Sequence, residues 1–320
     1  MKILVIGGAG YIGSHVLLEI MSAENEIVVF DSLEYGDKKN IPTAYQLIQG
    51  DILDQSALDK AMSGVDAVIH LAALKAAGES GEKINEYAEV NISGTINILN
   101  SMVKHGVKYM IFSSSAAVYG HPEVGQVTED SPTVPINFYG FTKLQIEHLL
   151  NWYSSEKNIQ FAALRYFNVA GYDLDGRVTG LEKNPNNLFP IIMENLKGIR
   201  TEIKVFGDDY DTHDGSCVRD YIHVKDLAVA HKLALDYIIE KGVNLTVNLG
   251  TSNGLSVKEV LEETERIFPG KLNVKIVGRR AGDPDKLICN YNLAKECLGW
   301  EPKNSTADKI IKSMMKVYGL

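Results

Sequence analysis

Short apolar runs alternate with amphipathic segments through the first half of the chain. The apolar runs predict strands, and the segments with helical periodicity predict helices. Strands that alternate with helices in this way indicate a parallel sheet with helices on both faces, so the predicted fold class is α/β, a doubly wound parallel sheet. The expected strands are 2–7, 26–31, 45–50, 66–71, 107–113 and 159–166, and the expected helices are 11–22, 54–63, 84–105 and 137–157.

The pattern changes after residue 169. Residues 171–187 are rich in Gly, Asp, Asn and Pro, and a loop of that length is expected to have a function. We therefore expect two domains, residues 1–169 and 170–320, with some chain crossing back to the first. The second is a smaller α/β lobe that can close over the carboxyl ends of the strands, where such folds bind ligands. Its expected elements are helices at 188–198 and 225–241, a strand at 246–249, and a helix at 256–267 with Ser256 and Glu259 as a capping box.

A glycine-rich turn follows the first apolar run directly, in the segment GGAGYIGSH. Gly8, Gly10 and Gly13 fit the pattern G-x-G-x-x-G, and Gly7 with the last two fits its G-x-x-G-x-x-G variant. Glycines here allow a tight turn and let backbone N–H groups approach a pyrophosphate at the N-terminus of the helix from Tyr11. Strand, glycines and helix in this order predict a Rossmann-type dinucleotide site.

The second apolar run ends in Asp31, at the distance from the glycines expected for a carboxylate that binds ribose hydroxyls. This carboxylate would repel a 2′-phosphate. Residues 32–40 contain no arginine to accept one, only Lys38 and Lys39. The sequence therefore favours NAD over NADP.

Two later segments extend the expected dinucleotide site. Asp51 follows the third apolar run and can meet the adenine amine, although such a residue alone would more often cap the helix that follows. The segment LAALKAAGES, after the fourth run, has small residues that permit close approach to the cofactor. Its Lys75, taken alone, would be a solvated loop lysine.

Candidate proton-transfer residues lie in the segment NFYGFTKLQIEHLL. Tyr139 and Lys143 are four residues apart, so on a helix the phenol and the ammonium share one face. A fixed cation favours the phenolate, so we expect Lys143 to lower the pKa of Tyr139 toward the working range of a general base. Ser115, at the end of the preceding strand, could orient the substrate hydroxyl. The group of residues predicts alcohol–ketone chemistry with a hydride acceptor.

Composition narrows the classes of function. The chain has 320 residues, 45% of them hydrophobic and 23% charged, which is typical of a globular protein. A net charge of −9 argues against binding to nucleic acid or to anionic membranes. No apolar stretch reaches about 18 residues, so no spanning helix is expected. Three cysteines without C-x-x-C spacing indicate a cytoplasmic protein without a metal site.

Several motifs in order carry a family resemblance that covers nearly the whole chain. They are GGAGYIGSH, LAALKAAGES, SSSAAVYG, RYFNVAG, NNL, FGDDY, GSCVRDYIHVKDLA and RRAGD. With them the sequence resembles the extended short-chain dehydrogenase/reductases, and among these the enzymes that epimerise UDP-glucose and UDP-galactose at C4. The block around Arg219 is the most specific motif. The resemblance implies NAD as the cofactor, a UDP-sugar as the substrate, and a 4-keto intermediate.

The resemblance also implies roles for single residues. Asn91, Ser115, Tyr139 and Lys143 match the family's active-site tetrad. The implied cofactor-binding residues are Gly7, Gly10, Tyr11, Ile12, Gly13, Asp31, Asp51, Ile52, Leu71, Ala72, Lys75, Asn91, Ser115, Tyr139, Lys143 and Phe167. The implied substrate-binding residues are Lys75, Ser115, Tyr139, Asn168, Asn187, Leu188, Val205, Phe206, Arg219, Arg280, Asp283 and Leu287.

Arginine forks suit a diphosphate, which supports the assignment of Arg219 and Arg280. Other interpretations of the second lobe stay open. Arg219 could instead form an ion pair with Asp220 or Asp226, and Asn187 could instead cap the helix from Leu188.

Three other functions compete with 4-epimerisation. A nucleotide-sugar 4,6-dehydratase needs an acid and a base after the serine motif, where this chain has Ala116 and Ala117. Sugar-acid epimerases share the fold. A regulator that senses NAD without catalysis would not need Ser115, Tyr139 and Lys143, which are all present.

Two further expectations rest on the resemblance. Leu287 falls where relatives place a gate beside the sugar's 2-position, and a leucine there would leave room for an N-acetyl group. If the gate is offset, Lys286 or Ile288 would occupy it. Relatives dimerise through helices that correspond to 92–105 and 140–156, so a homodimer is expected. Apolar residues compatible with this are Ile92, Ile96, Ile98, Leu99, Leu144, Leu149 and Leu150.

Overall fold

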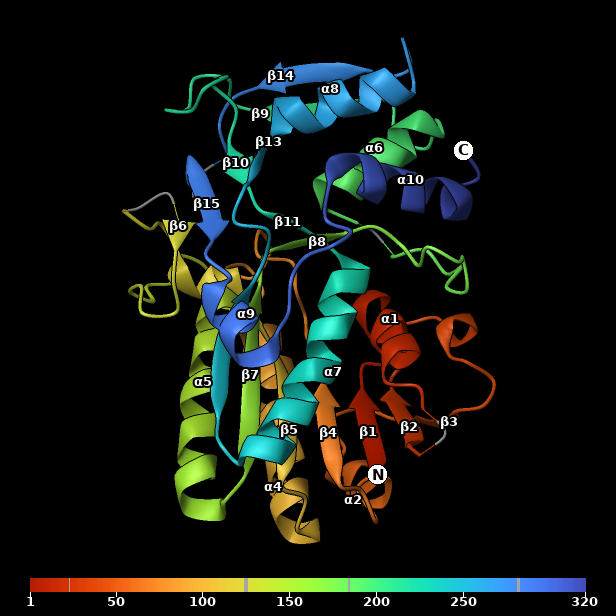
Figure 1. Cartoon of the computed structure of the whole chain (residues 1–320), viewed down its shortest axis with the longest axis vertical. Helices are drawn as coiled ribbons and strands as arrows, with labels where there is room; N and C mark the ends of the chain where they lie inside the picture. The colour runs from red at the N-terminus through yellow and green to blue at the C-terminus, as the bar shows by residue number, and fades with distance from the viewer. Residues whose placement is uncertain (23, 124–125, 184, 281–282) are drawn as a thin grey trace. The chain divides into compact units, whose positions relative to one another are not determined.

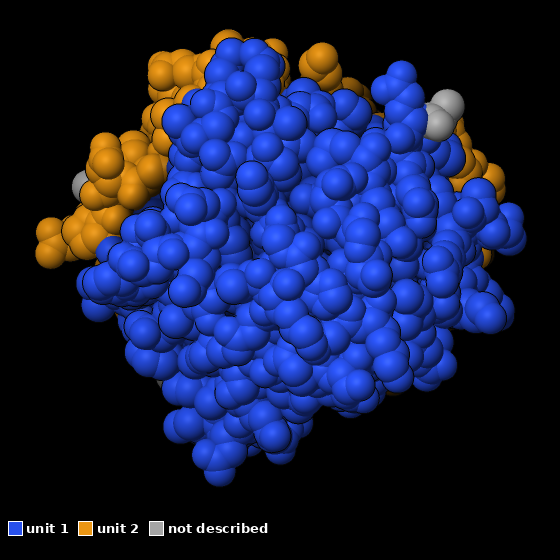
Figure 2. Space-filling view, turned by 90° about the horizontal axis from the view of Figure 1, so that it is seen from below, with its two compact units in different colours: residues 1–120, 133–165, 228–247 blue, residues 121–132, 166–227, 248–320 orange. Residues whose placement is uncertain are grey.

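The computed structural model describes residues 1–22, 24–123, 126–183, 185–280 and 283–320 (Figure 1). They form two compact units, which Figure 2 shows in different colours. Unit 1 comprises residues 1–120, 133–165 and 228–247, and unit 2 comprises residues 121–132, 166–227 and 248–320. The chain passes between the units several times. The domain boundary expected at residue 169 stays a prediction.

Unit 1 is built on a seven-stranded sheet with the order β12-β7-β5-β4-β1-β2-β3. The pairs β1–β2, β2–β3, β1–β4 and β4–β5 are parallel. The predicted α/β, doubly wound class is thus confirmed. The strands are β1 (Lys2–Ile6), β2 (Glu26–Asp31), β3 (Gln46–Gln49), β4 (Ala67–His70), β5 (Tyr109–Ser115), β7 (Gln160–Tyr166) and β12 (Leu245–Leu249).

Helices cover both faces of this sheet (Figure 1). On one face Leu4, Val28 and Phe112 are buried in a core with residues of α2, α4 and α5. The opposite face, where Val5 and Val29 are fully buried, is covered by α1 and α7. The helices are α1 (Tyr11–Glu19), α2 (Gln55–Ala61), α3 (Ile84–Tyr87), α4 (Gly94–His105), α5 (Phe138–Lys157) and α7 (Val224–Lys241).

One predicted helix has an irregular centre. The sequence predicts a single helix over 84–105, but a π-helical turn (Ala88–Ser93) separates α3 from α4. Such turns insert an extra residue into an α-helix and occur often at functional sites. The turn contains Asn91, whose side chain is buried.

Unit 2 has smaller sheets. One has four strands in the order β13-β10-β15-β6, and two further pairs are β11–β8 and β14–β9. The strands are β6 (Gln126–Val127), β8 (Asn168–Ala170), β9 (Ile203–Phe206), β10 (Val218–Arg219), β11 (Tyr221–His223), β13 (Leu255–Ser256), β14 (Val274–Val277) and β15 (Lys286–Cys289). The helices are α6 (Leu188–Leu196), α8 (Val257–Ile267), α9 (Asn292–Leu298) and α10 (Ala307–Tyr318).

The capping box predicted at Ser256 and Glu259 is present at the start of α8. All three cysteines are described, and each is a free thiol. In the described part of the chain, no helix has the length and apolar character needed to cross a membrane.

Candidate active site

The glycine-rich turn between β1 and α1 is packed so closely that side chains do not fit. A Cβ atom on Gly13 would lie 2.3 Å from the carbonyl oxygen of Gly7. Gly7 has φ +83° and a Cβ there would lie 2.6 Å from the amide nitrogen of Ala72. Gly10 is the N-cap of α1, and among the described residues no side chain caps this helix. The turn therefore presents backbone N–H groups at a helix N-terminus, as dinucleotide phosphates require.

Asp31 ends β2 and is buried. Its Oδ2 accepts a hydrogen bond from the amide of Ala9 at 2.9 Å, and its Oδ1 accepts one from the amide of Leu33 at 2.8 Å. The carboxylate thus holds the glycine-rich turn in place, a role that the sequence did not predict. A carboxylate has about four lone-pair sites, so acceptor capacity remains for ribose hydroxyls.

Tyr11 and Ile12 begin α1. Five further predicted cofactor residues of unit 1 lie on the loops after β3 and β4. Asp51 is exposed and accepts from the amide of Leu53 at 2.9 Å. The helix cap is Asp54, whose carboxylate accepts from the amides of residues 56 and 57, so the expectation that Asp51 caps α2 is wrong. Lys75 is exposed on the loop after β4. In the same region Ile52 is buried, and the amides of Leu71 and Ala72 both donate to the carbonyl of Ile6.

The structure brings Ser115, Tyr139 and Lys143 together. Ser115 is the last residue of β5, and its side chain lies close enough to Tyr139, in the first turn of α5, to lower the pKa of the phenol. The Lys143 Nζ atom lies 5.7 Å from the centre of the Tyr139 ring and 4.9 Å from that of Phe112. It donates to the carbonyl of Ser113 at 2.7 Å. The four-residue spacing places phenol and ammonium on one face, as predicted.

The electrostatics of this pair differ from the sequence-based expectation. Burial raises the pKa of Tyr139 to about 12, and the side chain of Ser115 opposes this change. Burial lowers the pKa of Lys143 to about 7, and the charge of Glu147 opposes that change. The expectation that Lys143 brings the phenol toward neutral pH is therefore wrong for the protein alone. Burial destabilises both the Tyr139 phenolate and the Lys143 ammonium. Each of these charged forms therefore needs the other nearby to be stable.

The side chain of Asn91 is occupied by contacts within the protein. Its Oδ1 accepts from the amide of Leu74 at 2.8 Å, and its Nδ2 donates to the Leu74 carbonyl at 3.0 Å and to Thr142 Oγ1 at 3.1 Å. Thr142 in turn donates to the carbonyl of Tyr139 at 2.7 Å. Asn91 thus ties the loop after β4 to the turn of α5 that carries Tyr139.

Sequence reasoning missed several residues that fix Tyr139. Ser80, which is buried, accepts a hydrogen bond from the Tyr139 amide at 3.1 Å. Asn137 caps α5 by accepting from the Gly140 amide at 2.8 Å. A Cβ atom on Gly140 would lie 2.4 Å from the carbonyl oxygen of Ala117. The sequence signals were Ser80 within LAALKAAGES and the asparagine before the helix.

In unit 2, Arg219 and Leu287 are neighbours. The two residues are register partners in the parallel pair β10–β15, so their side chains lie on the same face of the sheet. Arg219 Nη1 donates to the carbonyl of Pro284 at 2.7 Å, and its Nη2 lies 3.5 Å from Asp283 Oδ1. The structure therefore joins the predicted substrate residues Arg219, Asp283 and Leu287.

The two acids expected as alternative partners of Arg219 have other roles. Asp220 accepts from the amide and the hydroxyl of Thr251, both at 2.7 Å. Asp226 accepts from the amide and side chain of Asn304, again at 2.7 Å. The ion pair of Arg219 is formed with Asp283, so the expectation of Asp220 or Asp226 is wrong.

A second cluster pairs an arginine with an aromatic ring. The guanidinium carbon of Arg280 lies 4.2 Å from the centre of the Phe206 ring. Val205 precedes Phe206 on β9 and is buried. Ala281 and Gly282 of the RRAGD motif lie outside the described residues.

The remaining predicted substrate residues lie on β8 and at the start of α6. Asn187 is exposed at the N-cap of α6, before Leu188, yet within the described residues its side chain makes no capping hydrogen bond. Asn168 on β8 donates to the carbonyl of Asp220 at 3.3 Å, and the preceding Phe167 is buried.

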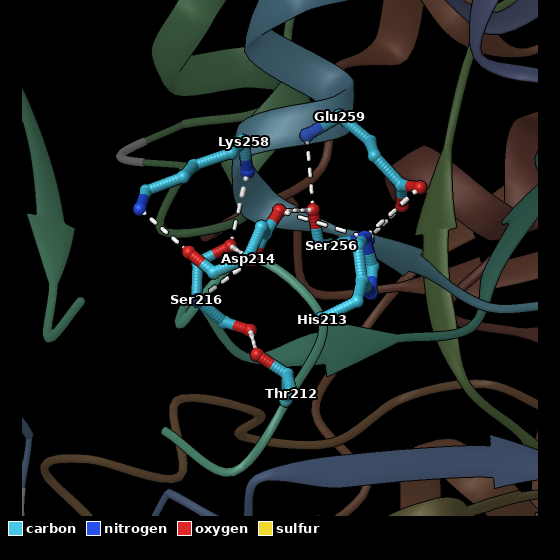
Figure 3. Close-up of polar contacts among 7 residues, drawn as sticks. All are labelled: Thr212, His213, Asp214, Ser216, Ser256, Lys258 and Glu259. Carbon is cyan, nitrogen blue, oxygen red and sulfur yellow. Dashed lines mark hydrogen bonds and ion pairs between the residues drawn. The ribbon is translucent and has the colours of Figure 1, made fainter. Parts of the chain in front are cut away.

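Polar contacts fold the segment that leads into β10 (Figure 3). Asp214 accepts from the amide and hydroxyl of Ser216 at 2.8 Å and bonds to Ser256 at the start of α8. Lys258 Nζ donates to the Asp214 carbonyl at 2.7 Å, and His213 Nε2 lies 3.2 Å from Glu259 Oε1. The segment just before Arg219 is thereby fixed to α8.

Comparison with known proteins supports the motif-based expectation. Residues 3–250 match the NAD dependent epimerase/dehydratase family. The chain belongs to this family. It is 43% identical over 317 residues to a UDP-glucose 4-epimerase of Streptococcus mutans, covering 98% of this chain and 95% of the relative.

Solved structures of the family agree. The chain resembles UDP-glucose 4-epimerase from Brucella ovis in complex with NAD, with a TM-score of 0.96 and 40% identity, covering 100% of this chain and 98% of the other. It also resembles the UDP-Glc/GlcNAc 4-epimerase of Campylobacter jejuni, with a TM-score of 0.87 and 37% identity, covering 99% of both chains. These family members share the predicted Rossmann-type fold.

Proposed function

We propose that this protein is an NAD-dependent 4-epimerase that interconverts UDP-glucose and UDP-galactose. The observation that carries the proposal is the assembly of Ser115, Tyr139 and Lys143 in the unit that also holds the glycine-rich turn. The family and its relatives named UDP-glucose 4-epimerase support it.

The glycine-rich turn fits NAD. Gly13 and Gly7 leave no room for side chains, and the N-terminus of α1 provides amides for a pyrophosphate. Asp31 retains acceptor capacity for ribose hydroxyls, and its charge disfavours the 2′-phosphate of NADP. When bound, NAD supplies a hydride acceptor that returns the hydride in the same turnover.

Tyr139 is assigned the proton transfer at the sugar O4 atom. Its hydroxyl lies near Ser115, which can also orient the sugar hydroxyl. Lys143, fixed by the Ser113 carbonyl, supplies the positive charge that a phenolate requires. The reaction returns the proton through Tyr139 after the 4-keto sugar has presented its other face.

The arginines of unit 2 are assigned to the UDP diphosphate. Arg219 is fixed by a carbonyl and by Asp283, and Arg280 stacks on Phe206. Guanidinium groups suit phosphate oxygens because they donate in pairs. Tight binding of UDP, with few contacts to the sugar, permits the sugar to rotate between the two half-reactions. The predicted residues Asn168, Asn187, Leu188 and Val205 are assigned to the same nucleotide-sugar.

Acceptance of UDP-GlcNAc and UDP-GalNAc is a second proposal. Leu287 lies beside Arg219 on the same face of the sheet, whereas Ile288 packs toward Gly254 and Lys286 is exposed. Leucine is shorter than tyrosine and leaves room for an acetamido group at the sugar's 2-position. A relative of similar fold is a UDP-Glc/GlcNAc 4-epimerase.

We further propose a cytoplasmic homodimer that pairs α4 and α5. Of the apolar residues expected to serve the interface, Ile98, Leu99, Leu144 and Leu150 are buried in unit 1 itself. Exposed apolar side chains on these helices are Val103, Phe141 and Trp152, which are 39%, 40% and 68% exposed. Sedimentation of the wild type and of Trp152→Glu tests the dimer, which the substitution should weaken.

Incubation of the purified protein with UDP-galactose tests the proposed activity. UDP-glucose should form without added cofactor, and Tyr139→Phe should remove the activity. A protein that retains NAD but converts neither UDP-sugar would instead be a binding protein without this activity.

A further inference from the structure

Helix α5 presents Tyr139, Lys143 and Glu147 one turn apart, toward the end of β5. Glu147 is buried with only 4% of its surface exposed, and sequence reasoning gave it no role. Each of the three side chains meets one of three consecutive serines. Ser115 lies near Tyr139, the carbonyl of Ser113 accepts from Lys143 at 2.7 Å, and Ser114 donates to Glu147 Oε1 at 2.5 Å.

Arg165 on β7 holds the carboxylate of Glu147 from the other side. Its Nε donates to Oε1 at 3.0 Å and its Nη2 donates to Oε2 at 2.6 Å, so the pair is bidentate. Its Nη1 donates to the hydroxyl of Tyr119 at 3.0 Å. Both members of the pair are less than a tenth exposed. Buried ion pairs contribute little net stability compared with apolar side chains of similar size. Stability alone therefore does not explain the buried charge of Glu147.

The charge of Glu147 acts on Lys143. Burial lowers the pKa of the Lys143 ammonium, and Glu147 raises it. Two other groups near the ammonium carry no negative charge. Phe112 of β5 offers a ring face, and His70 of β4 is neutral because burial and Lys143 lower its pKa to about 3.

Arg165 binds both carboxylate oxygens of Glu147. Burial disfavours the charge of Arg165, but hydrogen bonding and ion pairing with Glu147 raise its pKa. Two charge-assisted hydrogen bonds therefore hold the Glu147 carboxylate in place. It remains a fixed anion one helical turn from the ammonium.

We propose that Glu147, held by Arg165, is a positioning residue that keeps Lys143 protonated while Tyr139 transfers the substrate proton. The inference rests on the proposed epimerase function. Glu147 touches neither substrate nor cofactor in this assignment, and acts through Lys143 alone. Its removal should therefore change the pH dependence of the reaction more than the binding of the UDP-sugar.

The test is Glu147→Gln, which keeps the shape of the side chain and removes its charge. In the wild type, kcat should fall above the pH at which Lys143 loses its proton. In the variant this pH should be lower by about one unit, because a neighbouring opposite charge shifts a pKa by about one to three units. KM for UDP-galactose should stay within about twofold of the wild-type value, because the contacts that bind the substrate are not changed. An unchanged alkaline limb would overturn the proposal.

A second measurement does not depend on turnover. Lysine labelled with ¹³C at Cε reports its own protonation by NMR, and Lys143→Arg identifies the Lys143 signal. In the holoenzyme the titration of Lys143 should move to lower pH in Glu147→Gln. A wild type that shows no epimerase activity would refute the proposed function, whereas an unshifted Lys143 titration would refute the role of Glu147.

Two further variants separate charge from folding. The single variant Glu147→Gln leaves the buried charge of Arg165 unpaired, and this can prevent folding. The double variant Glu147→Gln with Arg165→Met removes both charges and avoids that problem. In the double variant, Lys143 should still titrate at a lower pH than in the wild type. A Lys143 titration at the wild-type pH would overturn the proposal. Asp59→Asn is the matched control, because Asp59 also accepts from a lysine and a serine, Lys104 and Ser101, in unit 1. It should lower the melting temperature without moving the Lys143 titration.

Discussion

Replacement of Asp31 by alanine should weaken both the cofactor and the fold. The substitution removes the acceptor of the Ala9 amide, which is buried, and that of the Leu33 amide, which solvent can reach more easily. Hydrogen bonds to a charged group contribute about 1.5–3 kcal/mol each, so the buried one alone costs about that much unfolding free energy. The melting temperature of the protein without cofactor should then fall by several degrees.

The same variant should lose affinity for NAD. Each charged hydrogen bond to the ribose, at about 1.5–3 kcal/mol, corresponds to about 10- to 100-fold in the dissociation constant. The assay is chromatography of the nucleotide released by denaturing the purified protein, with melting followed by circular dichroism. Asp31→Asn, which keeps one acceptor oxygen, should be intermediate.

A neighbouring acid provides the control for this experiment. Asp37 caps a short 3₁₀ turn by accepting from the amide of Lys39 at 2.9 Å, and Asp37→Ala should leave the NAD content unchanged. Retention of stoichiometric NAD by Asp31→Ala would refute the role of the carboxylate. So would NADP as the nucleotide released from the wild type.

Three more substitutions test separate parts of the site. Tyr139→Phe should reduce kcat by at least about 10²-fold with NAD still bound, since a general acid–base group is lost and the fold keeps its packing; near-normal turnover would exclude Tyr139 as the base. Gly13→Ala should abolish NAD retention because the new Cβ would lie 2.3 Å from the Gly7 carbonyl oxygen, and a normal nucleotide content would contradict this. Leu287→Tyr should remove activity on UDP-GlcNAc and spare UDP-galactose, since overpacking of the acetamido group costs about 1–3 kcal/mol. Equal loss of both activities, or of neither, would place the gate elsewhere.

The sheet of unit 1 could be predicted because most of its strands, though not the edge strand β3, are buried on both faces. Such strands are continuous apolar runs, as in the fully buried segment of β4, and they stand out between amphipathic helices. The glycine-rich turn and Asp31 could be predicted because their chemistry follows directly from the strands that precede them. Asp54, which caps α2, was overlooked in favour of Asp51 because both stand before the same helix.

Much of unit 2 could not be predicted from local pattern. Strand β14 has only four residues, Val-Lys-Ile-Val, and three of them are exposed, so its sequence gives no sign of a buried strand. Arg219 meets Asp283 across a strand pairing that the local sequence does not encode. Helix α10 did have a signal, since Thr306 caps it and Ile310, Ile311 and Met314 form its buried side.

The polar side chains that contact α5 were also missed by the predictions from sequence. The sequence shows Glu147 four residues after Lys143, but its pairing with Arg165 depends on the adjacency of α5 and β7 in the fold. The π-helical turn at Asn91 is likewise invisible in the periodicity, because a one-residue insertion leaves the segment helical.

The central claim is that C4 of the sugar is oxidised and reduced again within one turnover, while Tyr139 transfers only the O4 proton. Conversion of UDP-galactose by the purified protein in D₂O, followed by NMR of the product, tests it most directly. The UDP-glucose formed should carry no deuterium at C4, because the hydrogen on carbon never exchanges with solvent. Deuterium at C4, or no conversion by a protein that retains NAD, would contradict the claim.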